Sequence, residues 1–350
     1  MNINVEKLQM LLNEACDLQE EDSCQLAIYK SGKLIADICA GQNVSQDMLF
    51  PVFSVGKGLV ATLALKLYEE GKLDFDAPVS EYWKEFACNG KEDIKVWMIF
   101  SHRTGLHNMP VLESFEEQCD WQKMVQYMAE STPVNEPGTV CNYQGITFAW
   151  LAGEIIARAG GKSFNELFSE KISRPLGIEN EFYFGTNADA EKRVILPAVN
   201  TYWDWADFRN VFVSNPAIRA ACIPSANGYG TARAVAKIYA ALSGNGVDGV
   251  KLLDDSTVKY ATISRRAESD PLPDDIGAWA HFGLGYALMG YRHASGEIFG
   301  HGGALGAEGF AIPELELAVG FTKNKLNTTH PIHPLRDRIS KELNIKIRHW

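Results

Sequence analysis

The sequence lacks the features that mark membrane-spanning and nucleic-acid-binding proteins. No stretch of the 350-residue chain approaches the run of about 18 apolar residues that a membrane-spanning helix needs. The formal net charge of -11 opposes binding to phosphate backbones and anionic membranes, and no basic stretch offsets it. Residues 1–25 lack the charged, apolar and small-residue regions of a signal peptide. We therefore expect a soluble, cytoplasmic protein with no nucleic-acid or membrane partner.

Paired cysteines and metal motifs are also missing. The seven cysteines are odd in number, show no C-x-x-C spacing and are expected to be small buried thiols in a reducing compartment; they stand at positions 16, 24, 39, 88, 119, 141 and 222. The chain contains no H-E-x-x-H and no G-x-G-x-x-G. The isolated "HPIHP" at 330–334 is too rich in proline to suggest a metal site. We expect no metal and no organic cofactor.

The composition, with 46% hydrophobic and 22% charged residues, is that of an ordinary globular protein. Alternating runs on both sides of Ser31-Gly32 predict a β-hairpin over 25–41. Helical patterns fill the middle, a further helix is expected within 230–246, and strand patterns return between 281 and 324. This order predicts a sheet domain built from 1–75 and 222–350, a mostly helical domain from 76–221, and an active site in the cleft between them.

One lysine lies in the first turn of an apolar helix. The segment "FPVFSVGKGLVATLALKLYEEGKL", 50–73, is apolar nearly all round from Leu59 to Leu67, and Gly71 stands at its expected end. Ser54 is expected at the N-terminus of the helix, and the spacing to Lys57 places both side chains on one face. Burial would favour the neutral lysine, which could then accept the proton of the serine. The pair is therefore a candidate activated nucleophile.

The same spacing recurs at Ser256 and Lys259 in "LLDDSTVKY", where an exposed, charged helix start is expected. This second S-x-x-K serves as an internal control. No G-x-S-x-G surrounds any serine, because Val52 occupies the first glycine position before Ser54.

Two later segments carry further candidates. Tyr143 follows the Pro137-Gly138 turn and precedes a helix, and a phenol near a lysine can be biased toward the phenolate and act as a base. His301-Gly302-Gly303 lies on a predicted strand, where glycines let a ligand approach the backbone. Packing roles remain open for both segments. The aromatic loop at 200–212, with Trp203 and Trp205, could line an apolar pocket or pack as a lid.

Taken in order, S-x-x-K, "EPGTVCNY" (136–143) and "FGHGG" (299–303) resemble the serine β-lactamase-related family, which includes class C β-lactamases, DD-peptidases and family VIII carboxylesterases. The likeness also covers "FSHRTGL" (100–106), "SRPLGIEN" (173–180) and 223–246. It implies an α/β (α+β) β-lactamase/transpeptidase-like fold, with an antiparallel sheet flanked by helices plus a mostly helical domain.

The resemblance also implies roles for individual residues. Ser54 would be the nucleophile, Lys57 its proton partner, and Tyr143 would relay the proton to the leaving group. The backbone N–H groups of Ser54 and Ala304 would form the oxyanion hole, beside the substrate-binding residues His301, Gly302 and Gly303.

Two departures from the family pattern favour an ester substrate. The lactamase Tyr-x-Asn is here Tyr143-Gln144-Gly145, so the asparagine that positions a substrate amide is missing. The lactamase Lys-Thr-Gly is here a histidine followed by two glycines, and a mostly neutral imidazole suits an uncharged ester better than a carboxylate.

We therefore predict a serine hydrolase that acts through an acyl-enzyme on a small or medium carboxylic ester. Two alternatives remain open. One is a β-lactamase, D-amino-acid peptidase or acyl transferase that uses the same residues. The other is a non-catalytic binding or assembly module on a hydrolase fold.

Overall fold

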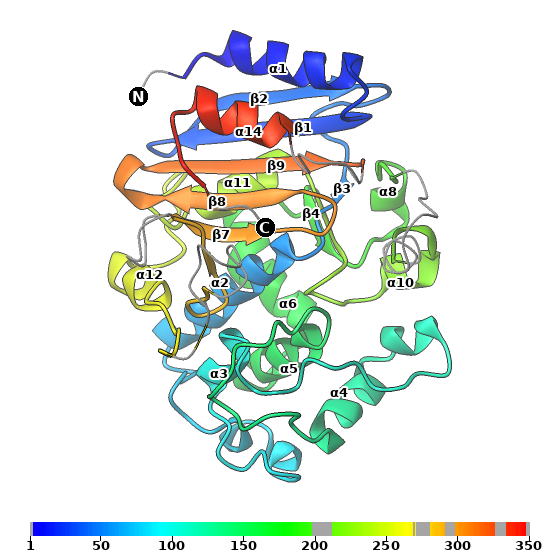
Figure 1. The fold of residues 1–350 in the computed structure, drawn as a ribbon, viewed down its shortest axis with the longest axis vertical. Helices are drawn as coiled ribbons and strands as arrows, with labels where there is room; N and C mark the ends of the chain where they lie inside the picture. The colour runs from blue at the N-terminus through cyan, green and yellow to red at the C-terminus, as the bar shows by residue number, and fades with distance from the viewer. Residues whose placement is uncertain are drawn as a thin grey trace.

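The computed structural model describes residues 3–197, 212–268, 270, 281–290, 298–325 and 334–347. Its main element is a six-stranded antiparallel sheet with the strand order β2-β1-β9-β8-β7-β6 (Figure 1). These strands are β1 (Ser23–Lys30), β2 (Lys33–Gly41), β6 (Ala287–Leu288), β7 (Phe299–Gly302), β8 (Glu308–Ile312) and β9 (Leu317–Lys323). The fold expected from the family resemblance, an antiparallel sheet with helices, is confirmed.

The N-terminal hairpin forms where it was predicted. Ser31 and Gly32 both have positive φ, 48° and 73°, which matches the tight turn that joins two strongly twisted strands. Strand β1 then pairs along its other edge with β9, near the opposite end of the chain. The two chain ends therefore complete one sheet, as the order of strand patterns indicated.

Helices cover both faces of this sheet. Helices α1 (Val5–Asp17) and α14 (Pro334–Glu342) pack on one face, where Leu8, Leu12 and Ile339 share a buried cluster with side chains of β1 and β9. Helices α2 (Val55–Glu69) and α11 (Ala232–Ala240) lie on the other face, as Figure 1 shows. Strand β9 is buried along its whole length because it is covered on both sides.

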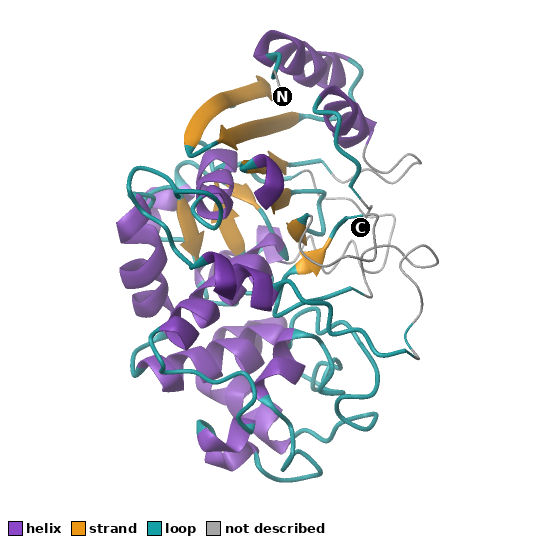
Figure 2. Ribbon diagram, turned by 90° about the vertical axis from the view of Figure 1, so that its left-hand side faces the viewer, coloured by secondary structure: helices purple, strands orange, loops and turns teal. Residues whose placement is uncertain are grey.

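The lower part of the molecule consists of helices and loops, as the side view of Figure 2 shows. Its helices are α3 (Val96–Phe100), α4 (Trp121–Glu130), α5 (Phe148–Gly160), α6 (Phe164–Phe168) and α7 (Arg174–Leu176). Short helices elsewhere are α8 (Ala188–Glu191), α10 (Pro216–Ala220) and α12 (Asp255–Ala261). The remaining single turns are η1 (Val79–Glu81), η2 (Lys84–Phe86), η3 (Phe115–Cys119), η4 (Ser169–Ser173) and η6 (Pro313–Leu315). The division at residues 76 and 221 stays a prediction.

A second, three-stranded sheet was not predicted. It has the order β3-β5-β4 and consists of β3 (Phe50–Pro51), β4 (Phe182–Phe184) and β5 (Gly228–Gly230). Strand β4 lies within the segment expected to be helical, and the strand expected over 281–290 is only Ala287–Leu288. Such short strands leave no room for a period-two pattern, which explains why the sequence did not reveal them.

Helix α2 is the element that positions the site. Its residues from Val55 to Leu65 are all buried, which fits a helix that is apolar on every side. The helix begins just after Ser54 and ends before Gly71, whose φ is 67°, as predicted. No helix in the described part of the chain is long and apolar enough to cross a membrane.

Candidate active site

Ser54 is placed at the start of α2 by a short, constrained turn. Strand β3 leads into Phe53, which has a positive φ of 47° although it is not glycine, and Ser54 then occupies the N-cap position of the helix. The side chain of Ser54 makes no capping hydrogen bond. Its hydroxyl is therefore available for the contact with the lysine one turn later.

Lys57 is fully buried and has a contact set suited to a neutral amine. Its Nζ lies 3.0 Å from Ser54 Oγ and donates hydrogen bonds to the carbonyl oxygens of Gly145, at 2.7 Å, and Ser225, at 3.0 Å. Burial holds the pKa of Lys57 well below its ordinary value. A neutral amine has two N–H donors and one lone pair. The two carbonyls can only accept, so the lone pair faces the serine hydroxyl.

Tyr143 approaches the same hydroxyl from the loop before α5. A hydrogen bond links its side chain to Ser54, and its ring centroid lies 4.9 Å from Lys57 Nζ. Burial raises the pKa of Tyr143, and the bond to Ser54 offsets this only in part. The expected bias toward a phenolate is therefore wrong for the resting site. A neutral lysine supplies no cation to stabilise a phenolate, so Tyr143 remains a phenol that can donate a proton.

The end of strand β7 lies against the turn that carries the serine. A Cβ built on Gly303 would stand 2.2 Å from the Val52 carbonyl oxygen, so only glycine allows this approach. Gly302 pairs with Glu308 in the sheet, while the amide of Gly303 donates to Ala307 O at 2.7 Å. This arrangement brings the next residue, Ala304, close to the start of α2.

Two amide groups at this junction have no protein partner within the described chain. There, neither the Ser54 N–H nor the Ala304 N–H donates a hydrogen bond to another described residue. Ser54 and Ala304 are both half-buried, and Ser54 stands at a helix N-terminus, where backbone N–H groups lack intrahelical partners and are open to a ligand. These two N–H groups can donate hydrogen bonds to the oxygen of a bound carbonyl group.

His301 is fully buried beside Tyr143, with 6.1 Å between the ring centroids. Burial holds the pKa of His301 well below its ordinary value. Its Nδ1 lies 2.7 Å from the carbonyl oxygen of Gly302, which can only accept, so this nitrogen carries the proton. The side chain is a neutral imidazole near neutral pH, as predicted from the sequence.

Comparison with known protein families matches residues 16–342 to the family described as Beta-lactamase. This chain belongs to the beta-lactamase family. It is a serine hydrolase of that family. "Esterase/beta-lactamase LipL" of Mycobacterium tuberculosis is 31% identical over 335 residues, which cover 86% of this chain and 76% of that protein.

Solved structures agree with this membership. A structure described as a family VIII carboxylesterase superposes with a TM-score of 0.84 at 27% identity and covers 98% of this chain and 99% of that chain. EstA from Arthrobacter nitroguajacolicus superposes with a TM-score of 0.83 at 25% identity, with the same coverage of both chains. The resemblance stated from the sequence motifs is confirmed.

The structure also supplies site groups that the sequence did not reveal. The two carbonyls that hold Lys57 belong to Gly145 and Ser225, and backbone atoms carry no residue-type signal. Gly145 stands where the lactamase pattern of the family has asparagine. A Cβ built on it would meet only Tyr143 ring atoms, at 3.9 Å and 4.0 Å, so the missing side chain leaves space beside the tyrosine.

The second S-x-x-K of the chain is not part of the site. Ser256 and Lys259 are both exposed on α12, a helix whose N-cap is Asp254. The second motif therefore lies on an exposed helix start, as the sequence predicted, and serves as a control for the S-x-x-K at Ser54. Residues 200–211 of the predicted aromatic loop, including Trp203 and Trp205, and residues 330–333 of "HPIHP" lie outside the described residues. Within the described ranges, no group of three or more metal-binding side chains is present.

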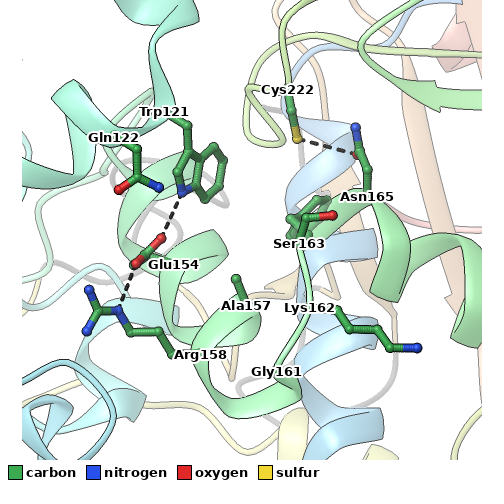
Figure 3. A pocket seen from close by; sticks show the side chains of 11 residues that line it. Trp121, Gln122, Glu154, Ala157, Arg158, Gly161, Lys162, Ser163, Asn165 and Cys222 are labelled. Atoms are coloured by element: carbon green, nitrogen blue, oxygen red, sulfur yellow. Dashed lines mark hydrogen bonds and ion pairs between the residues drawn. The ribbon is translucent and has the colours of Figure 1, made fainter.

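A separate cavity of about 510 Å³ lies along α4, α5 and α6. Figure 3 shows Trp121 and Glu154 on one side of it and Asn165 and Cys222 on the other. The indole Nε1 donates to Glu154 Oε2 at 2.7 Å, and the Cys222 thiol donates to Asn165 Oδ1 at 3.4 Å. Burial raises the pKa of Cys222 to about 12, so this thiol is not a nucleophile at neutral pH. No predicted site residue lines this cavity.

Proposed function

We propose that this hydrolase cleaves small or medium carboxylic esters through an acyl-enzyme on Ser54. The observation that carries the proposal is the contact set of Lys57. Of the three oxygen atoms within hydrogen-bond distance of Lys57 Nζ, two are carbonyl oxygens, which can only accept. A neutral amine therefore points its lone pair at the third, the Ser54 hydroxyl. That geometry makes the lysine the resting base and the serine an activated nucleophile.

In the acylation step, Ser54 Oγ bonds to the carbonyl carbon of the ester while its proton moves to Lys57 Nζ. The carbonyl oxygen becomes an oxyanion, which hydrogen bonds from the amides of Ser54 and Ala304 stabilise. When the tetrahedral intermediate collapses, the bond to the alkoxy oxygen breaks. The Tyr143 hydroxyl donates a proton to that oxygen and recovers one from Lys57, and the alcohol leaves.

Deacylation uses the same groups with water in place of the serine. Water loses a proton to the Tyr143–Lys57 pair as its oxygen attacks the acyl carbonyl, and the same two amides stabilise the second oxyanion. The bond to Ser54 Oγ then breaks, and the serine recovers its proton as the acid is released. The cycle requires no metal and no organic cofactor.

Two observations support an ester over a charged β-lactam. His301, a buried neutral imidazole, stands where the lactamase pattern has a lysine, so this position offers no fixed cation to a substrate carboxylate. Gly145 provides no side-chain amide to position a substrate amide. The similar proteins described as an esterase or carboxylesterase point in the same direction.

A β-lactamase is the second candidate, because the description of LipL includes both activities and both would use Ser54. The non-catalytic alternative has less support, because the nucleophile, the lysine and the tyrosine lie together.

The test compares hydrolysis of short-chain p-nitrophenyl esters and a chromogenic cephalosporin by the wild type, Ser54→Ala and the matched control Ser256→Ala. We expect ester hydrolysis by the wild type and by Ser256→Ala, and none above background by Ser54→Ala. Full activity in Ser54→Ala would refute the mechanism. Turnover of the cephalosporin alone would refute the ester preference, and no turnover of either substrate would favour the non-catalytic alternative.

A further inference from the structure

The segment 100–106 contains a histidine that the mechanism does not use. His102 follows α3, is fully buried, and has a positive φ of 60°. Its carbonyl oxygen accepts a hydrogen bond from the amide of Asn142 at 2.9 Å. Its ring Nδ1 accepts one from the amide of Gln144 at 3.3 Å. These two donors are the residues directly before and after Tyr143, so one histidine holds the backbone on both sides of the tyrosine.

The ring bond identifies the form of the histidine. A backbone N–H can only donate, so Nδ1 must carry the lone pair and the proton lies on Nε2. An imidazolium would present a second donor to Gln144 and lose this bond. Burial keeps the pKa of His102 well below its ordinary value. The ring therefore remains an acceptor at neutral pH.

The ring also supports Tyr143 by direct packing. Its centroid lies 4.8 Å from that of Tyr143, 4.4 Å from that of Phe282 and 5.3 Å from that of Phe148. The backbone of His102 lies in the left-handed region, which histidine adopts more readily than most residues other than glycine. Here that conformation accompanies the two hydrogen bonds that bracket the tyrosine.

The neighbouring residue extends the same anchor. The amide of Gly138 donates to the carbonyl oxygen of Arg103 at 2.7 Å, and the Arg103 guanidinium donates to the carbonyl oxygens of Gly138 and Thr139. The guanidinium is in turn paired with Asp270. The loop that carries Tyr143 is thus held along its length by residues 102 and 103.

We propose that His102 is a positioning residue that fixes the Tyr143 hydroxyl against Ser54 by holding the peptide groups on both sides of the tyrosine. The proposal rests on the proposed function, because that function gives Tyr143 its role in proton transfer. Within the described chain, the ring nitrogens of His102 make no hydrogen bond to Ser54, Lys57 or the Tyr143 hydroxyl. Loss of His102 should therefore lower turnover through Tyr143 and leave substrate binding nearly unchanged.

The test is a double-mutant cycle on a p-nitrophenyl ester, with kcat expressed per Ser54 titrated by a fluorophosphonate. His102→Phe keeps a ring among the aromatic neighbours but removes the acceptor. We expect kcat to fall by about 10- to 100-fold, the effect of one buried donor left unsatisfied, with KM changed by less than about threefold. In a Tyr143→Phe background, the same change should cost less than about threefold, because the group being positioned is already gone.

Two further variants keep the test decisive. His102→Asn retains an acceptor and tolerates the left-handed backbone, so its kcat should stay within about fivefold of wild type. Ile156→Ala, a buried change in α5 away from the tyrosine loop, should lower the melting temperature without changing kcat per titrated site.

The failures of the two proposals are distinguishable. Equal losses from His102→Phe in both backgrounds, or equal losses from His102→Phe and His102→Asn, would refute positioning by the ring nitrogen. A wild-type kcat in His102→Phe would refute it as well. If Tyr143→Phe alone kept the wild-type kcat, the role of Tyr143 in the proposed mechanism would be wrong. If His102→Phe yields no folded enzyme, the kcat of His102→Asn is compared in the wild-type and Tyr143→Phe backgrounds. An equal loss in both backgrounds would refute the positioning role.

Discussion

Replacement of Lys57 by methionine should change the pH dependence of stability in a way that reveals the protonation state of the lysine. Lys57 has an ordinary pKa of 10.5, and burial lowers that value in the folded protein. Below the ordinary pKa, the unfolded chain binds more protons than the folded chain at this site. The wild type therefore loses stability as the pH falls from 10.5 toward the folded pKa, and Lys57→Met does not undergo this loss.

The expected size follows from the linkage relation. Each pH unit within this window is worth about 1.4 kcal/mol, so the wild type should lose stability relative to Lys57→Met by up to about that amount for each unit that the pH falls below 10.5. The other titrating groups are common to both proteins, so the difference isolates the lysine. The same variant should lower kcat by about 10²- to 10⁴-fold, as expected for loss of a general base.

The assay is urea unfolding of both proteins at several pH values, with Ser54→Ala as the control. Ser54→Ala is expected to be inactive but keeps the buried lysine, so its stability curve should follow that of the wild type. Parallel curves for the wild type and Lys57→Met would contradict the reasoning. Such a result would mean that Lys57 binds its proton equally well in both states and is not a neutral base at rest.

Three other changes test neighbouring parts of the site. Gly303→Ala would force a Cβ against the Val52 carbonyl and displace the amide of Ala304, so we expect kcat to fall by about 10²- to 10³-fold. An unchanged kcat would argue against a role for the Ala304 amide in stabilising the oxyanion. Gly145→Asn should raise the ratio of cephalosporin to ester turnover by about tenfold, the value of one hydrogen bond, and an unchanged ratio would refute this specificity argument. Burial lowers the pKa values of His102 and His301, so unfolding experiments should show stability falling by up to about 1.4 kcal/mol per histidine for each pH unit below about 6.5; a flat profile there would contradict neutral histidines.

The sequence allowed much of the fold to be predicted where periodic patterns are long. The hairpin at Ser31-Gly32 and the apolar helix from Ser54 both had strong local signals. The spacing of Ser54 and Lys57, with Tyr143 and the histidine-glycine-glycine strand in order, also predicted which segments meet. Those segments come together because one sheet is completed from both chain ends and the tyrosine loop packs against α2.

The remaining features depend on tertiary structure. The carbonyls of Gly145 and Ser225 were missed because any residue carries the same backbone oxygen. The resting state of Tyr143 was predicted incorrectly because the balance between burial and a nearby cation is set by packing. Phe53 gave no sign of its left-handed backbone, since phenylalanine rarely adopts it. His102 was visible only as part of a motif until its two hydrogen bonds located it beside the tyrosine.

The central claim is that Ser54 is the residue that forms the acyl-enzyme. The most direct measurement is mass spectrometry of the protein after reaction with a fluorophosphonate or a slowly released ester, followed by peptide mapping. The account predicts one adduct per chain on the peptide that contains Ser54, none on the peptide that contains Ser256, and no adduct in Ser54→Ala. An adduct on another serine, or full labelling of Ser54→Ala, would contradict it.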